Sequence, residues 1–173
     1  MNKIIYLTLI LLSFNCFAQK KCKFQINESV ILENKNLDYF LEKMKSNTFE
    51  IQTKKQAIPH HIKKELDCLT EDFNIANPNQ KYQIGCLYQK EMPRRKLLFL
   101  AKSSDILILT YATGGIGSST HFLFIKYDSK QILDLWTGIA MGIFMPTSLD
   151  EITQYINSRR NLNWGLNTNM ISL

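Results

Sequence analysis

Two nearly continuous apolar runs, Lys96 to Ala101 and Ile106 to Tyr111, are the feature that most restricts how this chain can fold. A strand with one solvated face alternates apolar and polar side chains, whereas a continuous apolar strand indicates that both faces of its sheet are covered. The short polar segment Lys102 to Asp105 between the runs is typical of a hairpin connection. We therefore expect two central strands in a sheet that is covered on both sides.

Further strands are predicted before and after this pair. Thr48 to Thr53 and Tyr82 to Tyr88 alternate apolar and other side chains, as short half-buried strands do. Thr120 to Tyr127 and Gln131 to Thr137 are expected to form another antiparallel pair, joined at Asp128-Ser129-Lys130.

Helices are predicted on both sides of the strand-rich region. Asn36 precedes a helix with one apolar face, formed by Leu37, Phe40, Leu41 and Met44. A second helix is expected to begin with Pro59 at its first position. A last helix follows the capping box from Ser148 to Glu151. The predicted fold class is α+β: a mainly antiparallel meander of about five strands, flanked by N-terminal helices and a C-terminal helix.

The start of the chain has the layout of a secretory signal peptide. Residues 1–18 contain Lys3, then an apolar segment too short to span a bilayer, and end with small residues up to Ala18. We expect cleavage to leave one exported domain, residues 19–173, without a transmembrane helix, in the periplasm or outside the cell. The alternative is a lipoprotein with its lipid anchor on Cys16.

The charge and composition restrict the class of partner. The composition is that of a globular protein, and the net charge of +6 favours anionic partners or surfaces. The Lys and Arg residues do not form a dense stripe interleaved with aromatics, so we do not expect nucleic-acid binding. The partner expected from the sequence is a protein or a component of the cell envelope.

Three cysteines remain after the predicted cleavage: Cys22, Cys68 and Cys86. In an oxidising compartment we expect two of these cysteines to form a disulfide and the third to remain without a cysteine partner. Because Cys22 lies near the new terminus, we predict a Cys68–Cys86 disulfide. The other two pairings remain open at this point.

One set of residues suggests nucleophilic catalysis. Cys68, His121 and Asp134 follow the chain order of nucleophile, base and orienting group in papain-like peptidases and amidases. A two-residue turn at Asp128-Ser129 pairs Leu123 with Asp134 and places His121 and Asp134 on one face of the sheet, whereas a three-residue loop places them on opposite faces. This alternative reading is a cysteine hydrolase or amidase acting on peptide or cell-wall substrates.

No metal or organic cofactor is expected. His60 and His61 are adjacent on a helix, so they point in different directions and do not hold one ion together. The glycine-rich segment Thr113 to Ser119 precedes a strand pattern rather than a helix, and it contains no lysine. We therefore interpret it as a connection between strands and not as a phosphate-binding loop.

The segment from Trp136 to Pro146 is apolar throughout and contains two glycines. One interpretation is a buried crossover that covers the sheet. The other is an exposed binding patch, because adaptable Met side chains in an apolar surface are typical of partner sites. The patch residues predicted in that case are Trp136, Met141, Ile143, Phe144 and Met145.

These features favour an exported domain that binds a protein or an envelope component without catalysis, over the cysteine hydrolase. An inhibitor or immunity-like binding module fits the same features.

Overall fold

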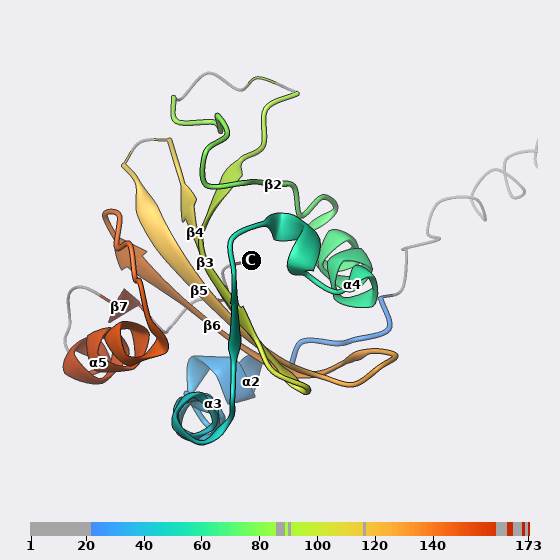
Figure 1. Cartoon of the computed structure of the whole chain (residues 1–173), viewed down its shortest axis with the longest axis vertical. Coiled ribbons are helices and arrows are strands. Elements are labelled where there is room, and N and C mark those ends of the chain that lie inside the picture. Colours follow the sequence, from blue (N-terminus) through green and yellow to red (C-terminus); the bar gives the residue numbers. More distant parts are fainter. Residues whose placement is uncertain are drawn as a thin grey trace, which may run out of the picture.

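The central element of the structure is a sheet with helices on both faces (Figure 1). The computed structural model describes residues 22–85, 89, 91–115, 117–161, 166–167, 171 and 173, with 166–167 described by their backbone alone.

The helices are α2 (Glu28–Leu32), α3 (Leu37–Ser46), α4 (His60–Thr70) and α5 (Leu149–Arg159), with a short 3-10 helix, η1 (Lys55–Ala57). The predicted α+β class is confirmed. No helix among the described residues has both the length and the apolar character needed to cross a membrane.

The strands follow an antiparallel meander with one parallel addition. Their bounds are β1 (Glu50–Gln52), β2 (Ile75–Ala76), β3 (Arg95–Lys102), β4 (Ile106–Thr113), β5 (Ser119–Tyr127), β6 (Ile132–Met141) and β7 (Leu166–Asn167). They lie in the order β1-β3-β4-β5-β6-β7, and β2 pairs with β3 in parallel. The sheet therefore grows outwards from the β3–β4 hairpin that the apolar runs predict.

Both faces of β4 and β5 are buried. Along β5, Leu123 and Ile125 point to the face covered by α4, whereas Phe122 and Phe124 point to the face covered by α3 and α5. Figure 1 shows α4 on one side of the sheet and α3 and α5 on the other. The prediction of central strands covered on both sides is confirmed. We refer below to the α4 face and the α3–α5 face.

The start of α5 forms as its sequence predicts. The Ser148 hydroxyl accepts a hydrogen bond from the Glu151 N–H at 3.2 Å, and the Glu151 carboxylate accepts from the Thr147 N–H at 2.7 Å. The first bond satisfies an amide that the first helical turn leaves without a partner. The bonds from Thr147 hold the pKa of the Glu151 carboxyl below its usual value.

The start of α3 differs from a standard cap. Asn36 is the N-cap residue, but its side chain makes no capping bond. Its amide donates instead to the Asp134 carboxylate at 2.8 Å and to the Leu135 carbonyl at 3.0 Å. Asn36 thus joins the helix to β6 rather than closing the helix end.

Several elements depart from the sequence prediction. β6 continues to Met141, beyond the predicted end at Thr137, because its neighbour β5 pairs with it along this whole length. Residues 82–85 are not a strand, and the rest of the predicted Tyr82 to Tyr88 strand falls largely outside the described residues. Helix α2 and strands β2 and β7 were not predicted, because each is too short to show a periodic pattern.

A disulfide joins Cys22 to Cys68 on α4, with the two Cα atoms 5.7 Å apart. The predicted Cys68–Cys86 pairing is therefore wrong, because a sulfur in a disulfide has one sulfur partner; Cys86 itself lies outside the described residues. The segment after Cys22 is held along α4 instead of fraying. The Phe24 N–H donates to the Glu65 carboxylate at 2.6 Å, and Phe24 packs against the core of the α4 face.

We expect Cys22→Ser to lower the free energy of unfolding, because the bond closes a loop across a sequence separation of 46 residues. The loss predicted from chain entropy is about 4 kcal/mol, measured by urea denaturation of the oxidised protein. Cys86→Ser is the matched control and should retain wild-type stability. A large loss in Cys86→Ser with none in Cys22→Ser would contradict the observed pairing.

Candidate functional site

The predicted catalytic group does not assemble. Cys68 is bonded to Cys22, so its sulfur is not a thiol that a base can activate. A nucleophilic cysteine requires the thiolate form, and the prediction of Cys68 as the nucleophile is therefore wrong.

The strand register also separates His121 from Asp134. His121 pairs with Ile139, and Leu123 pairs with Thr137 rather than with Asp134. His121 stacks on Tyr111 on the α4 face, while Asp134 bonds to Asn36 beside α3. The two side chains thus lie on opposite faces of the sheet, and the prediction that they interact is wrong.

The connection between β5 and β6 explains this register. The Asp128 carboxylate accepts hydrogen bonds from the Lys130 and Gln131 N–H groups at 2.7 and 2.9 Å. These bonds close a loop longer than the two-residue turn that would place His121 and Asp134 on one face. The pairing also shifts between Lys126 and Tyr127. The longer loop and the irregular pair together shift β6 along β5. Each later residue of β6 therefore pairs with a different residue of β5 than a two-residue turn would give.

His121 instead belongs to a polar cluster at the end of the β4–β5 hairpin. Its Nε2 atom lies 3.0 Å from the Thr113 hydroxyl oxygen and 3.0 Å from the Ser119 hydroxyl oxygen. The two hydroxyl oxygens are 2.8 Å apart. Ser119 and His121 share a face because they are two residues apart on one strand. That spacing was the available sequence signal for this cluster, which the sequence analysis did not identify.

Burial sets the protonation state of this cluster. His121 is 6 % exposed, and burial together with the charge of Arg95 lowers its pKa to about 4. The neighbouring Tyr111 ring stacks on it with centroids 4.8 Å apart, and burial raises the pKa of Tyr111 to about 12. Both side chains are therefore neutral near pH 7.

Arg95 holds this end of the α4 face together. Its guanidinium lies over the Phe73 ring, 4.7 Å from the centroid, and donates to the Leu173 carbonyl at 2.8 Å. A second bond reaches the Asp72 carbonyl at 3.2 Å. Arg95 thereby joins β3, the segment after α4 and residue 173 at one point.

The geometry of Ser119 and His121 is that of a hydroxyl beside a neutral base, but the burial and low pKa of His121 make it a weak base. Thr113 also shares the same nitrogen. We therefore assign the cluster a structural role, in which it joins the ends of β4 and β5.

The end of β6 and the loop after it lie next to this cluster and carry three of the exposed large apolar side chains found among the described residues. Met141 is 79 % exposed, Ile143 is 43 % exposed and Met145 is 68 % exposed. Met141 pairs with Ser119, so the loop begins at the same end of the sheet as the polar cluster. We call Met141, Ile143 and Met145 the loop patch.

The backbone of the loop patch is anchored. The Thr120 hydroxyl donates to the Gly142 carbonyl at 3.0 Å and accepts from the Phe144 N–H at 2.8 Å. The Phe144 ring stacks on Tyr155 of α5 with centroids 4.2 Å apart. Gly142 has a φ of +79°, which glycine adopts without strain. The three exposed side chains therefore project from a held loop.

Trp136 does not belong to this surface. It is completely buried on the α3–α5 face, and its indole N–H donates to the Asn34 side chain at 2.9 Å. Its ring lies over Gly138, where an added Cβ would come within 2.6 Å of it. The prediction of Trp136 as a patch residue is wrong, because β6 extends through it and turns it into the core. Phe144, also predicted in the patch, is only part-buried and serves as its anchor.

The described residues contain no group of three or more His, Cys, Asp or Glu side chains placed to hold a metal ion. Comparison with known proteins found no matching family model, and no curated protein or solved structure has significant similarity to the chain.

The pKa of His121 predicts a pH dependence of stability. The imidazole has a pKa of about 4 in the folded protein against 6.5 in an unfolded chain. Between these values the unfolded chain binds more protons, so the folded state loses stability as the pH falls from 6.5 towards 4. The expected loss is about 3 kcal/mol.

His121→Gln should remove this component of the pH dependence, because glutamine does not titrate. The measurement is the free energy of unfolding in urea at pH 7 and at pH 4.5 for both proteins. His60 and His61 are present in both and cancel in the comparison. Identical pH profiles for the two proteins would show that His121 does not titrate as proposed.

Proposed function

We propose that this chain is an exported binding module that docks a protein of the cell envelope through the loop patch and performs no catalysis. The observation that carries the proposal is the exposure of three large apolar side chains, Met141, Ile143 and Met145, on one anchored loop. Water contact with such a group is unfavourable, and clustered exposed apolar side chains mark interaction sites.

The anchoring of the loop supports binding. A loop that is ordered before it binds loses less conformational entropy in the complex. Two hydrogen bonds to Thr120 and the Phe144–Tyr155 stack hold the backbone, while the unbranched Met side chains at both ends of the patch adapt to a partner surface.

The proposed location rests on the leader and the disulfide. Residues 1–18 have the composition of a secretory signal peptide, and a Cys22–Cys68 disulfide is typical of proteins in oxidising compartments. The export proposal places the mature domain in the periplasm or outside the cell. A lipid anchor at Cys16 is the other arrangement consistent with the leader.

The test uses a matched pair of variants. Ile143 and Leu133 are both apolar residues of the β6 region, 43 % and 44 % exposed, but only Ile143 lies in the loop patch. We expect Ile143→Asp to reduce capture of a partner from a native envelope extract about tenfold or more, because a carboxylate is desolvated in an apolar contact. Quantitative mass spectrometry of the captured proteins is the measurement.

Leu133→Asp is the control and should capture the same partner as the wild type. The melting temperatures of both variants should match the wild type, since neither side chain lies in a core. Unchanged capture by Ile143→Asp, or an equal loss in both variants, would overturn the role of the loop patch.

A further inference from the structure

A pocket of about 620 Å³ lies where η1, the start of α4 and the edge of the sheet meet. This volume falls within the range of about 300–1,000 Å³ typical of small-molecule sites. Its lining includes Ile58 and Ile75, which are only 6 % and 1 % exposed and belong to the core, and the part-exposed Ala57 and Pro59, which provide an apolar floor. The pocket is separate from the loop patch, which leads into α5 on the opposite face of the sheet.

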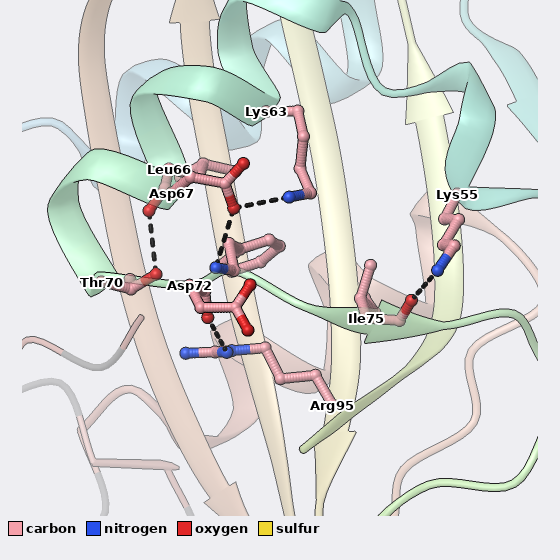
Figure 2. A network of polar contacts seen from close by, with 9 residues as sticks. Lys55, Lys63, Leu66, Asp67, Thr70, Asp72, Ile75 and Arg95 are labelled. Atoms are coloured by element: carbon pink, nitrogen blue, oxygen red, sulfur yellow. Dashed lines mark hydrogen bonds and ion pairs between the residues drawn. The ribbon is translucent and has the colours of Figure 1, made fainter. Parts of the chain in front are cut away.

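The charged side chains of this pocket are all basic. They are Lys55, Lys63 and Lys102, and no Asp or Glu is among the lining residues of the pocket. Figure 2 shows Lys55 of η1 and Lys63 of α4 on either side of Ile75 in β2. The pocket thus combines an apolar floor with lysines from three separate elements, η1, α4 and β3.

The three lysines differ in how far their charge is neutralised. Lys63 pairs with Asp67, whose carboxylate is also fixed by the Phe73 N–H at 2.9 Å. Lys102 pairs with Glu50 at 3.6 Å, but the Glu50 side chain is 69 % exposed, so this pair is weak.

Lys55 differs from the other two lysines in its partner. Its ammonium donates to the Ile75 carbonyl at 2.7 Å, which is a neutral acceptor, and no ion pair of Lys55 is found among the described residues. The same bond fixes the position of the ammonium in the pocket lining. A ligand anion that reaches Lys55 therefore gains a charge-assisted hydrogen bond without ordering a mobile side chain.

We propose that this pocket binds a small anionic amphiphile, with its carboxylate or phosphate on Lys55 and Lys102 and its apolar chain over Ala57 and Pro59. An uncharged apolar molecule gives the Lys55 ammonium no anionic partner, and a highly charged glycan leaves the apolar floor uncovered. An amphiphile with one anionic group satisfies both parts of the pocket. This proposal is independent of the loop patch.

The first test is isothermal titration calorimetry of the mature, oxidised protein at low ionic strength. Decanoate and decyl phosphate are the anionic probes, with decanol and decyltrimethylammonium as the uncharged and cationic comparators below their micelle concentrations. We expect both anions to bind, decanol to bind about tenfold more weakly and the cation not to bind. The tighter of the two anions identifies the head group that the pocket prefers. Equal affinity for decanol and decanoate, or binding of none of the probes, would overturn the proposal.

The second test removes single charges. Lys55→Gln is expected to weaken decanoate binding about tenfold and Lys102→Gln by a smaller factor, while the control Lys130→Gln, an exposed lysine in the β5–β6 loop, leaves it unchanged. If Lys55→Gln fails to fold, the test uses Lys102→Gln alone. That variant should fold, because the ion-pair partner of Lys102, Glu50, is exposed. Wild-type affinity in Lys102→Gln and in a folded Lys55→Gln, or an equal loss in Lys130→Gln, would show that pocket charge does not hold the ligand.

Discussion

Burial of β4 and β5 on both faces is the constraint on which the rest of the structure depends. These strands expose apolar side chains in both directions, so the sheet is stable only when each face is covered. α4 and the ordered segment after Cys22 cover one face, while α3 and α5 cover the other. The disulfide, the Asn36 bonds to β6 and the capped start of α5 all serve to hold these covering elements against the sheet.

The two proposed binding sites lie where the helices cease to cover the sheet. At one end of the sheet, β6 leaves the core and enters α5, and the loop patch projects from that turn. Where η1 and the start of α4 meet the edge of the sheet, a basic pocket with an apolar floor remains open. The polar cluster of Thr113, Ser119 and His121 is different in kind, since its imidazole is buried and its three side chains bond to one another. Exposure, rather than the presence of reactive residue types, separates the two proposed sites from this cluster.

The errors in the predicted site arose from non-local geometry. Register between β5 and β6 depended on the Asp128 loop and on an irregular pair at Lys126 and Tyr127, which no local pattern shows. Disulfide pairing depended on how the segment after Cys22 lies along α4, where Glu65 accepts a backbone bond from Phe24. A shift of register or a change of cysteine partner alters which side chains meet, even when every strand and helix is predicted correctly.

The sequence by itself determined the α+β class, the central buried hairpin, the amphipathic α3 and the capping box of α5. Each of these depends on spacing between near neighbours, and hydrophobic periodicity and helix capping act over a few residues. Only the tertiary structure decided that Trp136 is buried while Met141 and Met145 are exposed, and that Lys55, Lys63 and Lys102 share one pocket. Those outcomes depend on which distant segments pack together, because burial and charge environment are properties of the assembled fold.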